Sequence, residues 1–390
     1  MDYQFIASDK ALAEFCSSIA DSGCCAIDTE FVREKTYYPI FALLQIATEQ
    51  RMACIDPFAI EDFSPLQNLL QSTGLTKVFH ASRQDLEVLF QQFGTVPTPV
   101  FDTQLAAAVL GFTQQISYAE LVFEITSVSL DKKHTRADWS RRPLSNDELD
   151  YAMDDVRYLL PVYHHLKQAL EDKQRARWIE QDLADMSKAA NYLIDSDHLW
   201  RKLKGVQKLK GVELQIALQL CEWRENLAQQ KNRPRRWVAA DHWIVDIARK
   251  KPVNFEALAS VRGIPAKLLD RYGQTWLQIV AEALQVDHSK WPTLKKTVIL
   301  DLQQQALGDC LMALCRVIAQ DNHIALSTLA TRKDIDNLIL DRKTSRLAQG
   351  WYFEVAGQQL LDFMHAQSCL GVDNKGRIQT FPRRNVPNSV

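Results

Sequence analysis

Residues 24–32 of the chain read CCAIDTEFV, a short apolar run into which two carboxylates are set. The apolar run predicts a buried strand, and side chains alternate between the two faces of a strand. Asp28 and Glu30 therefore point one way, while Thr29 and Phe31 point the other. Two like charges roughly 7 Å apart on one face repel each other and resist burial. A divalent cation would explain the pair, and so would the solvent-exposed end of a strand; this stretch alone leaves both open.

Composition sets the limits within which the stretch is interpreted. A chain of 390 residues predicts two or three domains, and 46% hydrophobic with 24% charged residues is typical of a soluble globular protein. The formal net charge of -2 implies no strong global attraction to nucleic acid or to an anionic membrane, so local charge matters more. Neither a signal segment nor an apolar run near the roughly 18 residues of a membrane span is visible. We expect a cytoplasmic protein without a membrane partner.

The first part of the chain, residues 1–170, alternates between strand and helix patterns. Strands are predicted at 24–32, 41–47, 52–55, 77–80 and 100–101, and helices at 10–19, from 64, at 82–93, at 103–110 and from 146. This order predicts an α/β domain in which helices flank a mixed sheet, with a hairpin between the second and third of these strands. Residues 129–143 are predicted to form a long loop with an exposed Trp139. The helix that follows Ser145 is predicted to be long and kinked at Pro161.

The second part is predicted to be helical. We expect a helical linker at 171–209, helical domains at 210–290 and 291–370 that repeat one order of helices, and a disordered tail at 371–390. Residues 199–250 are basic, with twelve Lys and Arg against five acids. They include a turn that carries Arg233, Arg235, Arg236 and Trp237. This turn is either a solvated charged turn or a nucleic-acid-binding patch that contacts phosphates and stacks on a base.

Two further features bear on the paired acids of residues 24–32. Tyr151 and Asp155 are four residues apart on a predicted helix and so lie on one face, whereas Asp154 turns about 100° away. A phenol and a carboxylate that interrupt an apolar stripe cost free energy unless they meet partners. Asp85 lies near the start of a helix that follows a strand, where the helix dipole also favours an acid. Each feature alone also fits an ordinary surface residue.

Together, and in this order, the motifs Asp28-x-Glu30, Asp85 and Tyr151-x-x-x-Asp155 resemble those of the DEDD superfamily of 3′-5′ exonucleases, in its tyrosine subtype. Similar flanking motifs are Phe31-Val32-Arg33, Tyr37-Tyr38-Pro39, Leu44-Gln45-Ile46, Phe101-Asp102-Thr103 and Tyr151-Ala-x-x-Asp-Val-x-Tyr-Leu. With these, the chain resembles the ribonuclease D family, and its basic helical part resembles the HRDC domain. The resemblance implies a ribonuclease H-like exonuclease domain followed by two all-α HRDC-like domains.

The resemblance also implies a chemistry. Two divalent metal ions, Mg²⁺ or Mn²⁺, would be bound by Asp28, Glu30, Asp85 and Asp155, with Asp28 shared, and Tyr151 would orient the attacking water. The implied activity is hydrolytic removal of 3′-terminal nucleotides, as 5′-monophosphates, from tRNA precursors with 3′ extensions, by a monomer. Two alternatives remain open at this point: a DNA-directed 3′-5′ exonuclease and a non-catalytic RNA-binding protein.

Overall fold

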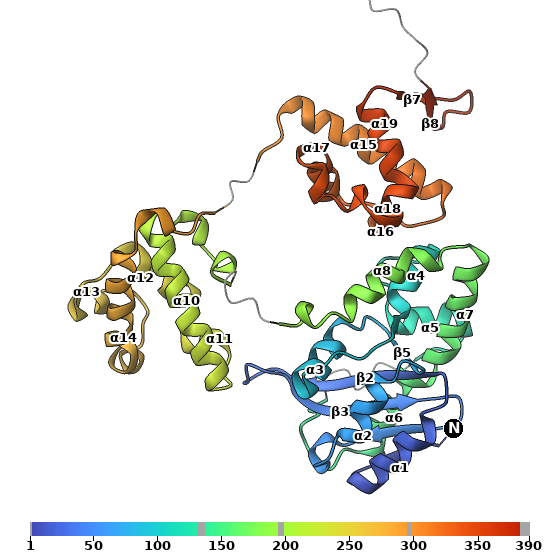
Figure 1. Cartoon of the computed structure of the whole chain (residues 1–390), viewed down its shortest axis with the longest axis horizontal. Coiled ribbons are helices and arrows are strands. Elements are labelled where there is room, and N and C mark those ends of the chain that lie inside the picture. The colour runs from blue at the N-terminus through green and yellow to red at the C-terminus, as the bar shows by residue number, and fades with distance from the viewer. Residues whose placement is uncertain (1, 131–136, 194–198, 295–297, 383–390) are drawn as a thin grey trace, which may run out of the picture. The chain divides into compact units, whose positions relative to one another are not determined.

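The computed structural model describes residues 2–130, 137–193, 199–294 and 298–382. It divides the chain into two compact units (Figure 1). Unit 1 comprises Met1–Phe31, Phe41–Tyr192 and Val298–Val390, and unit 2 comprises Val32–Ile40 and Leu193–Thr297.

Unit 1 is built on a six-stranded mixed sheet in the order β1-β4-β3-β2-β5-β6. The strands are β1 (Gln4–Ile6), β2 (Cys24–Val32), β3 (Ile40–Ala47), β4 (Met52–Ile55), β5 (Thr76–Phe79) and β6 (Val100–Asp102). β3 runs antiparallel to β4, while β1 is parallel to β4 and β5 is parallel to both β2 and β6. The predicted mixed sheet and its hairpin are confirmed. β1 was not predicted from the sequence. It has only three residues, two of them exposed, which is too short for an alternating pattern to be visible.

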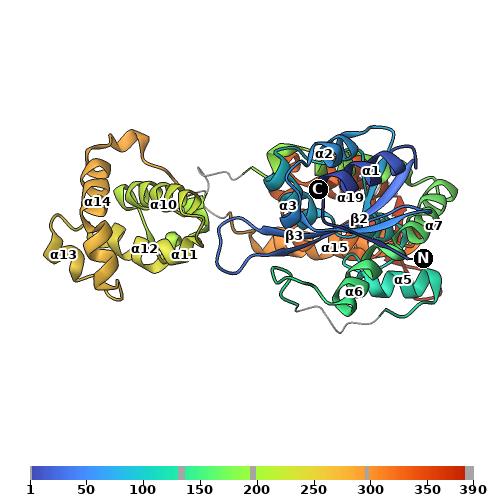
Figure 2. The ribbon, with the colours of Figure 1, turned by 90° about the horizontal axis from the view of Figure 1, so that it is seen from below.

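Helices cover both faces of this sheet (Figure 2). They are α1 (Asp9–Ile19), α2 (Ser64–Gln71), α3 (Arg83–Phe93), α4 (Thr103–Leu110), α5 (Tyr118–Thr126), α6 (Asn146–Arg157), α7 (Leu159–Asp172) and α8 (Ala176–Met186). One core joins α1, α2 and α3 to the sheet through side chains such as Phe15, Leu66 and Leu86. Ile27 of β2 belongs to that core. Its neighbour Asp28 therefore faces the other side of the sheet, where α6 packs on β4.

The start of α6 is fixed by its cap. Ser145 and Glu148 form a capping box in which each side chain bonds to the other's backbone N–H. The long helix expected from residue 146 is interrupted at Tyr158, where α6 ends and α7 begins. Pro161 lies in the first turn of α7 and lacks the N–H that would bond to the Arg157 carbonyl in a continuous helix, which accounts for the break at the place of the predicted kink.

The C-terminal helices of unit 1 pack on its α/β part, the part that contains the six-stranded sheet. They are α15 (Leu302–Asp321), α16 (Leu326–Leu329), α17 (Arg332–Leu340), α18 (Gly350–Tyr352), a π-helical turn (Phe353–Gly357) and α19 (Gln358–Met364). Trp351 stacks on Trp178 of α8, with ring centroids 4.9 Å apart and planes 5° from parallel. The Arg175 guanidinium donates to the carbonyl of Val109 at 2.7 Å and to that of Asn322. The expected separate domain at 291–370 is thus, from Val298 on, part of unit 1.

The chain end differs from the predicted tail. β7 (Ser368–Val372) and β8 (Ile378–Pro382) form an antiparallel hairpin. Its turn is stabilised by the Asp373 carboxylate, which accepts from the backbone N–H groups of Lys375 and Arg377, and by Gly376 at φ 76°. Residues 371–382 are therefore ordered, and residues 383–390 lie outside the described residues.

Unit 2 is a helical bundle. Its helices are α10 (Val212–Gln230), α11 (Arg235–Val238), α12 (Asp241–Lys250), α13 (Phe255–Ala259) and α14 (Ala266–Gln285). Trp200 and Leu209, both placed in the expected linker, are buried in its core with Trp276. The order of a long, a four-residue and a medium helix repeats in α15, α16 and α17. In each copy the second residue after the long helix, Asn232 or His323, has a positive φ of 44° or 50°.

Candidate active site

Three carboxylates meet where β2 faces α6. Asp28 and Glu30 come from the strand, and Asp155 comes from the helix. One carboxylate oxygen from each lies within 4.8 Å of the other two, a spacing that a single metal ion can bridge. The strand alternation and the helix face predicted from the sequence thus bring these three residues together.

Asp85, the fourth predicted carboxylate, lies in the first turn of α3 and is held by β2. Its Oδ1 accepts a hydrogen bond from the Thr29 hydroxyl at 2.6 Å and one from the Thr29 N–H at 3.2 Å. Asp85 lies outside the group of three, but its charge raises the pKa of Asp28, Glu30 and Asp155. The role of Thr29 was not predicted from the sequence. The signal was a hydroxyl on a buried strand between two acids, because a buried hydroxyl needs a hydrogen-bond partner.

The electrostatics of the site are those of uncompensated negative charge. Burial is the largest cause and repulsion from the neighbouring carboxylates adds to it, so that the pKa of Glu30 rises to about 8 and that of Asp155 to about 7. The same causes raise the pKa of Asp28 well above its usual range. Burial raises the pKa of Asp85 to about 7, although its hydrogen bonds with Thr29 act to lower it.

These residues fit a divalent cation. All their donor atoms are carboxylate oxygens, which Mg²⁺ and Mn²⁺ prefer, whereas zinc favours nitrogen and sulfur. Bound positive charge would also offset the repulsion that raises the pKa of each acid.

Tyr151 lies one turn before Asp155 on α6. Burial, followed by the charges of Asp155, Glu30 and Asp28, raises the pKa of its phenol to about 12. The phenol is therefore neutral near pH 7 and can donate a hydrogen bond. Trp139 stacks on the Tyr151 ring, with centroids 6.4 Å apart and planes 24° from parallel. The expectation of an exposed Trp139 was wrong, since only 5% of the residue is exposed.

The predicted basic patch is split by the structure. Arg233, Arg236 and Trp237 are exposed, with 57% of Trp237 accessible. Arg235 instead donates through Nε and Nη2 to the buried Glu225 carboxylate, at 2.5 and 2.7 Å. Its guanidinium also lies over the Tyr37 ring, 4.9 Å from the centroid. Arg235 is therefore engaged inside unit 2, whereas the other three side chains are accessible to a ligand.

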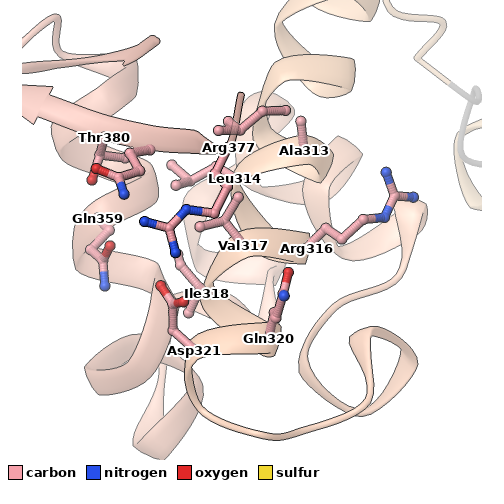
Figure 3. Close-up of a pocket in the computed structure, with 12 residues that line it drawn as sticks. Ala313, Leu314, Arg316, Val317, Ile318, Gln320, Asp321, Gln359, Arg377 and Thr380 are labelled. Atoms are coloured by element: carbon pink, nitrogen blue, oxygen red, sulfur yellow. The ribbon is translucent and has the colours of Figure 1, made fainter. Parts of the chain in front are cut away.

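A cavity of about 500 Å³ lies elsewhere in unit 1, between α15, α19 and β8 (Figure 3). Arg316, Gln359 and Thr380 are among its lining residues, and it contains none of the predicted site residues. Within the described ranges, none of the helices combines the length and the hydropathy of a membrane-spanning segment.

Comparison with known proteins identifies the family of this chain. Residues 3–171 match the model of a 3′-5′ exonuclease domain, and residues 213–280 match that of the HRDC domain. The ribonuclease D of Granulibacter bethesdensis is 35% identical over 95% of this chain and 94% of its own length, and that of Jannaschia sp. is 36% identical over 94% and 96%. The structure is similar to that of Escherichia coli RNase D, an exoribonuclease involved in structured RNA processing, with a TM-score of 0.85 and 29% identity over 94% of this chain and 99% of that one. The chain belongs to the ribonuclease D family and is a 3′-5′ exoribonuclease of that type.

Proposed function

We propose that this exoribonuclease acts with two divalent ions, Mg²⁺ or Mn²⁺, and that Asp28, Glu30, Asp85 and Asp155 hold them. The observation that carries the proposal is the meeting of three carboxylates within 4.8 Å in a site that raises the pKa of each. When bound, such ions would stabilise charge on the scissile phosphate and supply a nucleophilic water.

The residues divide this work among them. Asp28 would be shared by the two ions, as the family resemblance implies, and it is one of the three carboxylates that meet within 4.8 Å. Glu30 and Asp155 would bind the ion that activates the attacking water. Asp85, which accepts hydrogen bonds from Thr29, would bind the second ion. Tyr151 donates from its neutral phenol and so orients the attacking water, which a group with a pKa of about 12 cannot deprotonate near pH 7.

We further propose that the substrates of this protein are tRNA precursors with 3′ extensions and that the products are nucleoside 5′-monophosphates. We propose that the protein acts in the cytoplasm as a monomer. The similarity to an exoribonuclease involved in structured RNA processing supports this choice. So do the exposed Arg233, Arg236 and Trp237, since two cations and an indole are suited to a phosphate backbone and an unstacked base.

The test is a time course on a 3′-extended tRNA and on a matched single-stranded DNA, each with Mg²⁺ or Mn²⁺. We expect stepwise shortening of the RNA from its 3′ end, 5′-monophosphate products, a stop near the mature end, and no reaction in excess EDTA. Equal rates on the DNA would refute the substrate assignment. Nucleotide release that persists in EDTA, after contaminating nucleases are removed, would refute the metal mechanism.

A further inference from the structure

The segment between Asp138 and Ser145 contacts the active site through the ring of Trp139, which packs on Tyr151. The indole is buried and packs nearly parallel to the phenol ring of Tyr151. Tyr151 is only partly buried itself. A tyrosine side chain that lacked this packing surface would be free to occupy other rotamers. The stack therefore restricts where the phenolic oxygen can lie relative to Glu30 and Asp155.

Arg142 fixes the backbone of Trp139. Its Nη1 donates to the carbonyls of Trp139 and Arg141, at 2.8 and 2.7 Å. Its Nε and Nη2 donate to the two carboxylate oxygens of Asp56, both at 2.7 Å, and Nη2 also donates to the carbonyl of Ala42 at 2.5 Å. These contacts use all five N–H donors of the guanidinium. Arg142 thus ties the segment to β3 and to the end of β4.

The same segment anchors the helix that carries Tyr151. Arg141 donates from Nη2 to the Glu148 carboxylate at 3.0 Å, and Glu148 is the capping-box residue of α6. The segment therefore restrains Tyr151 twice, through its ring at Trp139 and through the first turn of its helix.

We propose that Trp139 is a positioning residue for Tyr151, and that the ion pair between Arg142 and Asp56 holds Trp139 in the position this requires. The inference rests on the orienting role of Tyr151 stated under the proposed function. It adds that the role depends on a residue outside the proposed metal ligands, one that acts by packing on the Tyr151 ring.

The test is a double-mutant cycle, with kcat and KM measured on a 3′-extended RNA. Tyr151→Phe removes the phenolic oxygen that orients the attacking water and should lower kcat about 100-fold, the effect of a reacting group misplaced by about 1 Å. Trp139→Leu should lower kcat at least about 10-fold and leave KM within about twofold, because displacement of a positioned group by about 1 Å affects chemistry more than binding. Trp139→Phe keeps a flat ring and should restore most of kcat. In the Tyr151→Phe background, Trp139→Leu should cause no further loss.

A matched control separates positioning from general destabilisation. Trp351→Leu disrupts another buried stacked pair of unit 1, Trp351 on Trp178. It should lower the melting temperature while the folded fraction keeps its kcat. Arg142→Lys retains the charge but loses the planar fork, so it should lower kcat as Trp139→Leu does and, likewise, have no effect in the Tyr151→Phe background.

The outcomes are distinguishable. An unchanged kcat in Tyr151→Phe would overturn the proposed role of Tyr151 itself. Suppose that Tyr151→Phe lowers kcat strongly and that the double variant Trp139→Leu/Tyr151→Phe shows additive losses. The role of Tyr151 would then stand, and the inference about Trp139 would be overturned. If Trp139→Leu does not fold, Trp139→Phe and Arg142→Lys decide: wild-type kcat in Arg142→Lys would overturn the inference.

Discussion

Asp28 is buried beside Glu30 and Asp155, and burial together with the charges of Asp85, Asp155 and Glu30 raises its pKa, so a cation would stabilise its ionised form. Asp28→Asn or Asp155→Asn keeps the shape of the side chain but removes a metal ligand and its charge. We expect either change to lower exonuclease turnover by at least about 1000-fold, because metal-assisted hydrolysis depends on the ligands that hold the ions. RNA binding, measured by fluorescence anisotropy, should persist.

Asp154→Asn is the matched control for Asp155→Asn. Asp154 is the adjacent residue, but it pairs with Arg157 and is not in the carboxylate group. This variant should stay within a few-fold of the wild-type rate. Near-wild-type turnover in Asp28→Asn or Asp155→Asn would contradict the assignment of the site.

The raised pKa values also predict how the metal-free protein responds to pH. Glu30, Asp85 and Asp155 have folded-state pKa values of about 8, 7 and 7, above the roughly 4 of an unfolded chain. A group of this kind contributes stability in full below its unfolded pKa and loses that contribution as the pH rises through its folded pKa. In EDTA, the free energy of unfolding should therefore fall as the pH rises from about 5 to about 8.

Thermal denaturation at several pH values checks this prediction. Mg²⁺ should raise the melting temperature more at pH 8 than at pH 5.5, because a bound cation offsets a repulsion that exists only between ionised carboxylates. Asp28→Asn should flatten the pH dependence in EDTA. A melting temperature in EDTA that rises over this pH range would show that the carboxylates do not repel one another as described.

At the scale of elements, the turn before α11 and the turn before α16 occupy the same place in the two helical repeats but differ in chemistry. The first contains Arg233, followed by Arg236 and Trp237 in α11, all exposed. We expect Arg236→Ala combined with Trp237→Ala to weaken binding of structured RNA. The slope of the logarithm of the binding constant against the logarithm of the salt concentration should fall by about the contribution of one phosphate contact. Lys267→Ala, an exposed cation on α14, is the charge-matched control and should change the slope less.

Arg235 should behave differently from Arg236. Its removal leaves the Glu225 carboxylate, whose side chain is 1% exposed, without its cation. Arg235→Ala should therefore lower the melting temperature of unit 2 rather than change the salt slope. A flattened slope with unchanged melting temperature would place Arg235 in the RNA-binding patch after all.

The end of α4 gives a second prediction at this scale. Gly111 caps α4 at φ 111°, and a Cβ there would lie 2.6 Å from the His323 carbonyl oxygen in the turn after α15. Gly94 caps α3 at φ 71° with nothing within 4 Å of such a Cβ. Gly94→Ala should cost only the left-handed strain of about 1–2 kcal/mol, whereas Gly111→Ala adds a backbone clash. Thermal melts should show the larger loss for Gly111→Ala; equal losses would mean that the turn shifts freely.

At the scale of the whole molecule, the sequence predicted what depends on local pattern. The alternation along β2 placed Asp28 and Glu30 on one face of the strand, and the four-residue spacing placed Tyr151 and Asp155 on one face of α6. The family resemblance then joined them into one site, and the structure brings Asp28, Glu30 and Asp155 together. What the sequence could not provide were contacts between distant segments. Trp139 lies in a polar stretch that predicts exposure, yet the residue is buried and its ring stacks on that of Tyr151.

The division of the chain into two units depends on distant contacts as well. The long helices of the two repeats have similar lengths and amphipathic patterns, so they were expected to be equivalent domains. The deciding contacts are few and long-range, such as Trp351 on Trp178 and Arg175 on the carbonyl of Asn322. They place the second repeat in unit 1 with the nuclease part, and a pattern within one segment contains no information about them.

The repeated turn with a positive φ, at Asn232 in one copy and at His323 in the other, has a consequence for how this chain can evolve. If the repeats arose by duplication, the two turns began alike and then came under different selection. Mutations that alter charge near Arg233 and Arg236 would be selected against when they weaken ligand binding. Mutations near Asn322 and His323 would be selected against when they disturb the fit to Gly111 and Arg175. An exchange of the two turns between the copies would therefore impair both, although each turn has the same backbone shape.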